Sequence, residues 1–235
     1  MGRVGDRRCR QGTLGQAARR GTRVARCVRV RDNHQCRDLA ALGKRPRIDP
    51  AATVASTATV CGDVAVGPGC RILHGATVVA EGGRIVLGRD RIVMENAVIR
   101  ATGRYDCTVG DHCLIGPCAH VVGCTVEHEV FIATGAAIFH GARLGRRSQV
   151  RIHGVVHLRT ALPPGSTVPI GWVAVGDPAA ILPPDQHERI WAIQEPLDFP
   201  ASVYGVPRGE AAMVEITRRL SGELAAHGDD ESVRT

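Results

Sequence analysis

The side chains of this sequence best suited to chemistry are histidines in its central part. They are His120, His140, His153 and His157, with His74 further upstream. A neutral imidazole accepts a proton as a general base or binds a metal ion. These residues therefore suggest either a metal site or a group-transfer site with a histidine base. The opposing interpretation is that they are ordinary surface histidines, because ten in 235 residues is no strong excess.

A six-residue period governs the segment that contains these histidines. Aliphatic residues recur six apart at Ile48, Val54, Val60, Val66, Ile72 and Val78, and the period returns at Leu87, Val93 and Ile99 and again after residue 108. Four residues after each stands a mostly small one, such as Ala52 or Cys70. Helices have a period of about 3.6 and hairpin strands a period of about two, so neither explains this pattern. It predicts an all-β fold, a left-handed parallel β-helix (hexapeptide repeat) over residues 40–182.

Two interruptions break this period. Residues 80–86 and 101–108 are predicted to protrude as loops. Among the nine cysteines no disulfide or zinc-finger spacing occurs. Cys70 and Cys113 fit the small inward position, whereas Cys118 and Cys124 are expected at exposed corners.

C-terminal α-helices are expected over residues 183–228, followed by a tail at 229–235. A capping box of Asp185 and Glu188 predicts a first helix that ends near Gln194. A second helix is predicted from residue 208 to residue 227. It has an apolar stripe that we expect to lie along the β-helix, formed by Met213, Ile216, Leu220 and Leu224.

Basic charge is confined to the N-terminal part of the chain. Residues 1–49 carry 14 basic and 4 acidic residues (14 − 4 = +10), and residues 50–235 carry 16 and 19 (16 − 19 = −3), which gives the net charge of +7. The body is mildly acidic, so we expect no nucleic acid partner. Residues 1–39 are predicted to be disordered or to come from a misplaced start site, with a basic arm or a transit peptide as alternatives. No apolar run approaches the ~20 residues of a membrane span, so we expect no membrane partner and a cytoplasmic location.

The order of the repeats resembles two related groups of proteins. The resemblance rests on the loops, on a five-residue repeat that ends in Gly123-Cys124-Thr125, and on the closing segment Val173–Leu182 (VAVGDPAAIL). Over about residues 41–195 the chain is similar to the gamma-class carbonic anhydrases and to the isoleucine-patch acetyltransferases. The resemblance implies a homotrimer that binds small molecules in the clefts between neighbouring β-helices.

The zinc site that the first resemblance implies is altered in this sequence. Its three histidine positions are occupied by Arg100, Pro117 and Val122. Three neutral imidazoles leave an open zinc position for a catalytic water, and none of these residues can replace one. The family's Arg-Gly-Asp becomes Val79-Ala80-Glu81, and a glutamine becomes Met94, whereas Asn96 persists. Zinc is therefore not expected in the standard site.

A rearranged metal site is a separate possibility. It would use His120 and His140 as ligands, with His74, His157 and Cys118 as further candidates. His157 is expected in the same column of the β-helix as Arg100 and Val122. Spacing alone does not establish the geometry that a metal requires.

The second resemblance implies a CoA-dependent acyltransferase with acetyl-CoA or CoA as co-substrate. A histidine would be the general base, and the candidates are His120, His140, His153 and His157. In that superfamily the closing segment lies near CoA, which makes Gly176, Pro178 and Ala179 candidate CoA-binding residues. Trp172 could stack on a ligand or cover the last layer of the core. Acyl transfer is the function that the sequence favours first.

A non-catalytic trimer is the next interpretation, followed by a metal-dependent lyase. Loss of the zinc ligands in an intact repeat fits a protein that binds a small molecule or serves in assembly. Arg100 and Arg151 would then favour an anionic ligand. The alternative is that both arginines are simply solvated.

Overall fold

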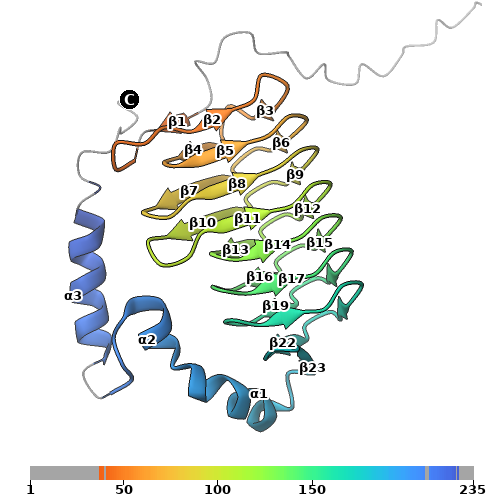
Figure 1. Ribbon diagram of the computed structural model, residues 1–235, viewed down its shortest axis with the longest axis vertical. Helices are drawn as coiled ribbons and strands as arrows, with labels where there is room; N and C mark the ends of the chain where they lie inside the picture. Colours follow the sequence, from red (N-terminus) through yellow and green to blue (C-terminus); the bar gives the residue numbers. More distant parts are fainter. Residues whose placement is uncertain (1–36, 40, 210–211, 226, 228–235) are drawn as a thin grey trace, which may run out of the picture. The chain divides into compact units, whose positions relative to one another are not determined.

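The computed structural model describes residues 37–39, 41–209, 212–225 and 227 (Figure 1). All of them belong to one unit, Asp32–Thr235. The predictions for the basic segment up to residue 36 and for the tail at 229–235 lie outside the described residues. Within the described residues the first strand is β1 (Arg37–Leu39), which pairs with β4 (Thr59–Cys61) and starts three residues before the boundary expected at residue 40.

Three sheets form a β-helix of about seven turns, and the left-handed hexapeptide fold predicted from the period is confirmed. Sheet 1 consists of β1, β4 (Thr59–Cys61), β7 (Thr77–Glu81), β10 (Val98–Thr102), β13 (His120–Val122), β16 (Ala137–Ile138), β19 (Val155–Val156), β22 (Val173–Val175) and β23 (Ala180–Leu182). Sheet 2 consists of β2 (Arg47–Ile48), β5 (Val64–Val66), β8 (Ile85–Leu87), β11 (Cys107–Val109), β14 (Thr125–Val126), β17 (Arg143–Leu144) and β20 (Ala161–Leu162). Sheet 3 consists of β3 (Thr53–Val54), β6 (Arg71–Ile72), β9 (Ile92–Val93), β12 (Leu114–Ile115), β15 (Phe131–Ile132), β18 (Gln149–Val150) and β21 (Thr167–Val168).

The aliphatic positions of the repeat stack directly on one another inside the β-helix. In sheet 1, register partners in successive turns form one fully buried column: Val78, Ile99, Val121, Ile138 and Val156. Burial of each such side chain stabilises the fold by about 1.5–3 kcal/mol relative to exposure. The inward position therefore selects for aliphatic residues, and this selection produces the six-residue period.

One small inward position holds an arginine instead. Arg91 stands four residues after Leu87 and is 1% exposed. Its guanidinium contacts the Sγ of Cys70, and its Nη2 lies 3.5 Å from an Oδ1 of Asp111. Burial lowers the pKa of Arg91, and the nearby thiols and the Asp111 carboxylate oppose this effect. A buried cation in the core is thus neutralised from the next turn of the β-helix.

The two interruptions are shorter than predicted. Ala80 and Ala101 still belong to strands of sheet 1 and are buried, and Ile85 and Cys107 already begin strands of sheet 2. Only the few residues between these strands leave the period. Each inserted segment lies at the corner between sheet 1 and sheet 2, so it does not disturb the strands on either side. Cys118 is exposed as expected, but Cys124 is 2% exposed, so its predicted exposure is wrong.

The C-terminal segment contains more elements than the sequence indicated. They are α1 (His187–Gln194), a 3-10 helix η1 (Glu195–Leu197), α2 (Phe199–Tyr204) and α3 (Ala212–Ala225). The predicted capping box does not form, since Gln186 is the N-cap of α1 and no side chain caps that end. Ile190 and Ile193 of α1 pack with Val175 and Leu182 at the end of the β-helix.

The apolar stripe of α3 is only partly covered. Ile216 is 6% exposed, whereas Met213 is 66% and Leu224 is 47% exposed. The expectation that the whole stripe lies along the β-helix is therefore wrong. Within the described ranges, no helix combines the length and the apolar character needed to cross a membrane.

Candidate functional site

The positions that correspond to gamma-class zinc ligands do not meet within the chain. Arg100 in β10 and Val122 in β13 are register partners on the outer face of sheet 1. Pro117 lies in the turn between β12 and β13, at the corner between sheet 3 and sheet 1. The structure also places His157 in the predicted column with Arg100 and Val122. Val121, Ile138 and Val156 are register partners in successive turns, so His157, which follows Val156, lies two turns from Val122.

Arg100 is neutralised by an acidic residue of the preceding turn. Its guanidinium forms a short ion pair with Glu81 of β7, and both side chains are only partly exposed, at 37% and 25%. Glu81 stands where the resemblance places an aspartate. The guanidinium is therefore held by a carboxylate at a position where the related site would bind zinc.

An aromatic cluster surrounds two of the candidate histidines. The His157 ring stacks on Phe139 with 5.5 Å between centroids, and the His140 ring lies 5.3 Å from that of Tyr105. Phe199 of α2 lies against both, with centroids 6.5 Å from His140 and 6.3 Å from His157. Three separate parts of the chain thus enclose these imidazoles: sheet 1 and its corners, the loop after β10, and α2.

Burial keeps these imidazoles neutral. It lowers the pKa of His140 from 6.5 to about 4, with smaller contributions from the charges of Arg100 and His120. Burial also lowers the pKa of His157, and burial together with the Arg100 charge lowers that of His120. The Nδ1 atoms of His140 and His157 are buried without a hydrogen-bond partner. An unpaired polar atom in an apolar site costs free energy, which makes this cluster a functional candidate.

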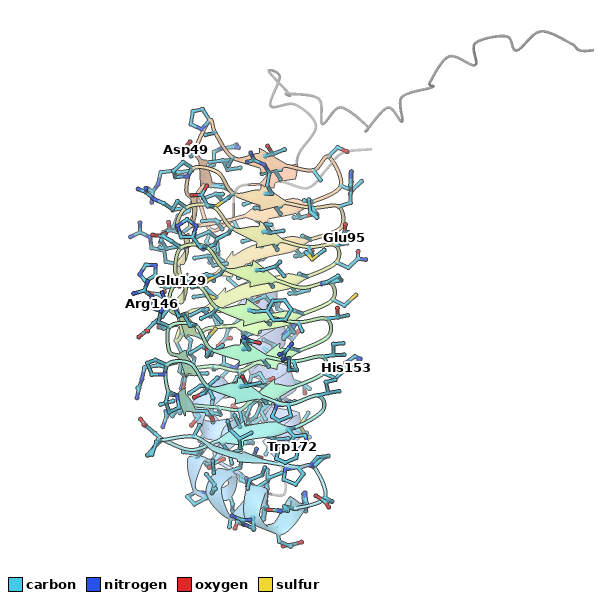
Figure 2. All side chains as sticks on the ribbon, turned by 90° about the vertical axis from the view of Figure 1, so that its right-hand side faces the viewer. Asp49, Glu95, Glu129, Arg146, His153 and Trp172 are labelled. Atoms are coloured by element: carbon cyan, nitrogen blue, oxygen red, sulfur yellow. The ribbon has the colours of Figure 1, made fainter. Side chains whose placement is uncertain are left out.

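His74 and His153 lie outside this cluster. Figure 2 shows His153 on the same edge of the β-helix as Glu95, and Glu129 beside Arg146 on another edge. The Nδ1 of His74 is 2.9 Å from the hydroxyl of Thr57. Within the described ranges no three His, Cys, Asp or Glu side chains are grouped as a metal site requires. Among the described residues, the proposed rearranged site of His120 and His140 therefore has no third ligand from the same chain.

Comparison with known proteins gives two kinds of match. A protein of Arabidopsis thaliana named gamma carbonic anhydrase 1, mitochondrial, is 31% identical over 158 residues, which cover 65% of this chain and 55% of that protein. A probable carbonic anhydrase of Methanocaldococcus jannaschii is 25% identical over 142 residues, 60% of this chain and 86% of that protein. No family model matches.

The similarity to these relatives is consistent with the six-residue repeat of the sequence and with the parallel β-helix of the structure. The chain is a hexapeptide-repeat protein. A solved structure of a putative acetyltransferase from Bacillus cereus covers 83% of this chain and 96% of its own, with a TM-score of 0.47 and 17% identity. That likeness supports no conclusion about activity. The chain also spans only about half the length of the first Arabidopsis relative, so the activity of that whole protein does not transfer directly.

The predicted CoA-binding residues of this hexapeptide-repeat protein close the end of the β-helix. Figure 2 shows Trp172 near the end of the stack opposite Asp49. Trp172 and Ala179 pack against the last layers of the main core. The backbone of Gly176 accepts a hydrogen bond from the Ala161 N–H, and that of Ala179 donates one to the Ala161 carbonyl. These contacts favour the capping role that we considered for Trp172. A role in CoA binding stays a prediction for Trp172, Gly176, Pro178 and Ala179.

Several residues of the site carry no signal in the sequence that marks them as functional. Phe199 and Tyr105 enclose His140, and Arg104 and Arg159 lie beside them. Phe199, Tyr105 and Arg104 stand outside the repeat, and Arg159 occupies a corner of it, where the period selects no residue type. Asp198 could have indicated α2, because its carboxylate accepts the Ala201 N–H at the start of that helix and a proline follows at residue 200.

Proposed function

We propose that this hexapeptide-repeat protein is a non-catalytic homotrimer that binds a small molecule and does not hydrate carbon dioxide. The ion pair between Arg100 and Glu81 is the observation on which the proposal rests. A guanidinium has no free lone pair and stays protonated, so it cannot ligate a metal. It supplies instead a fixed positive charge at the position of a zinc-bound imidazole, and its partner carboxylate keeps it there.

The other two ligand positions lead to the same conclusion. Pro117 and Val122 offer no donor atom. His120 and His140 lie near Arg100, whose charge acts on both imidazoles, and this charge also disfavours a second cation between them. Zinc therefore does not fit the residues present, and we propose no reaction step that uses it.

The same positions support the proposed homotrimer. Pro117 lies at a different corner from Arg100 and Val122, so the three positions could come together only between neighbouring copies of the chain. We propose that the clefts between copies persist although their metal chemistry is lost. A cytoplasmic location, as expected from the sequence, is part of this proposal. The Arabidopsis relative, in contrast, is named mitochondrial.

Acyl transfer is the second candidate. A neutral imidazole with an unpaired Nδ1 is the form that a general base needs, and His140 and His157 both have it. A base is most effective when its pKa lies near the working pH, and the pKa of His140 is only about 4. His140 would therefore remove a proton poorly near neutral pH, which places this candidate second.

One preparation of the full chain tests these alternatives. We expect light scattering to give three times 25.0 kDa, zinc analysis to give a substoichiometric content, and stopped-flow assays to give no hydration of carbon dioxide above background.

The Glu81→Gln variant should lower the free energy of unfolding, because it leaves the Arg100 charge unpaired. An Arg100→Met, Glu81→Met double variant should restore this free energy.

Three results would contradict this picture in different ways. Stoichiometric zinc together with carbon dioxide hydration would overturn the proposed function. A monomer in solution would overturn the homotrimer. Protection from heat by acetyl-CoA, lost in a His140→Leu variant, would favour acyl transfer over a non-catalytic role.

A further inference from the structure

A pocket of about 630 Å³ lies beside the histidine cluster. Its lining consists of Arg104 and Tyr105 from the loop after β10, Arg159, and Ala201 and Ser202 of α2. Small-molecule sites usually have volumes of about 300–1,000 Å³. The pocket is therefore large enough for a small organic molecule and too large for a bare inorganic ion.

Hydrogen bonds hold the walls of this pocket together. The Tyr105 hydroxyl donates to the backbone carbonyl of Ser202 at 3.2 Å, and Nη2 of Arg159 donates to the same hydroxyl at 3.5 Å. Nη1 of Arg104 donates to the backbone carbonyl of Ala201 at 3.5 Å. These contacts keep both guanidinium groups at the pocket but use only one of the five N–H donors of each.

Neither guanidinium has an acidic partner in the described part of the chain. Other arginines of the β-helix do form ion pairs with carboxylates, as Arg100 does with Glu81 and Arg143 with Asp177. Arg219 lies beside Arg104 against Gly205, but it forms an ion pair with Glu215 of α3, so the argument rests on Arg104 and Arg159 alone. The nearby His140 is neutral, so it adds no charge to the pocket. The pocket thus presents two exposed cations with unused donors, and no acidic side chain lies among its lining residues.

We propose that this pocket binds an organic anion through a phosphate or carboxylate group that Arg104 and Arg159 grip together. The planar fork of a guanidinium matches the oxygen pairs of both groups. The inference rests on the proposed function, since it names the ligand of a non-catalytic protein. It uses other arginines than the Arg100 and Arg151 expected from the sequence, because Arg100 is already paired and Arg151 lies at a different corner of the β-helix.

Calorimetric titration of the full chain with phenyl phosphate and with benzoate tests this proposal at constant ionic strength. We expect at least one probe to bind saturably and the stronger of the two to identify the anionic group. Arg104→Ala and Arg159→Ala should each weaken binding by about tenfold or more, as expected for a lost charge-assisted hydrogen bond. Arg151→Ala is the matched control and should leave binding unchanged.

A second variant separates anion binding from simple docking of α2. Tyr105→Phe removes the hydroxyl that links Arg159 to Ser202 but keeps both cations, so binding should stay within about threefold of that of the wild type. If Tyr105→Phe abolishes binding as completely as the arginine variants do, the arginines only position α2 and the proposal is wrong. Failure of both probes to bind the wild type would also overturn it. Neither result bears on zinc content or on hydration of carbon dioxide. The absence of carbonic anhydrase activity in the proposed function is therefore tested separately, by zinc analysis and the stopped-flow assay.

Discussion

Acidification from pH 6.5 to about 4 is expected to remove roughly 3 kcal/mol of stability through His140 alone. The folded protein holds this imidazole neutral in an apolar cluster, whereas in the unfolded chain it titrates near its ordinary value of 6.5. Between these two values the unfolded chain binds the additional proton. The contribution is therefore fully present above pH 6.5 and is lost as the pH falls to about 4. His120 and His157 change the stability in the same direction because their pKa values are also lowered.

Urea unfolding at one protein concentration and a series of pH values measures this effect. A His140→Leu variant keeps an apolar side chain against Phe199 and Tyr105 but does not titrate, so its stability should depend less steeply on pH. His187→Gln, at an exposed position of α1, is the matched control and should keep the wild-type slope. Equal slopes for His140→Leu and the wild type would show that His140 titrates normally in the folded protein.

Replacement of Gly110 by alanine is expected to lower the free energy of unfolding by about 1–3 kcal/mol. A Cβ at this corner would lie 2.5 Å from the carbonyl carbon of Glu127, 2.7 Å from its oxygen and 2.7 Å from the nitrogen of His128. All three are backbone atoms of the next turn, and the Gly110 N–H also donates to Val126. The clash cannot be relieved by a side-chain rotation, so the spacing between two turns must change.

Thermal and urea unfolding of Gly110→Ala can be compared with those of Gly103→Ala. Gly103 has no atom within 4 Å of the added Cβ, so its substitution should change stability by less than about 0.5 kcal/mol. A Gly110→Ala protein as stable as Gly103→Ala would mean that the turns of the β-helix adjust more easily than close packing allows.

The six-residue period predicted the β-helix because one physical requirement repeats in every turn. An inward side chain such as Ile138 must fill the space between its neighbours one turn away, and this requirement depends on the local sequence alone. The same register placed Arg100, Val122 and His157 correctly in one column. Arg91 departs from the pattern, since its long side chain occupies a small position by reaching Asp111 in the next turn.

The candidate site was less predictable because part of its wall comes from segments that obey no period, and because the period does not specify outward side chains. The ion pair between Arg100 and Glu81 depends on which side chains face outward in neighbouring turns. Phe199 reaches His140 and His157 only because the chain turns back after α1, and α2 is too short to show a helical period. The sequence identified the histidines, but the low pKa of His140 results from burial by these later elements.

The way in which the β-helix ends affects how copies of the chain can associate. If the last parallel strand of a β-helix were uncovered, its unpaired N–H and C=O groups could pair with the strand of another copy, and repeated pairing would produce a fibre. Here β23 reverses direction and pairs antiparallel with β22, and α1 packs Ile190 against the same layer. The reversed strand occupies the hydrogen-bonding edge of sheet 1 at which a further turn would add. At this end the chain carries its own barrier to end-to-end polymerisation.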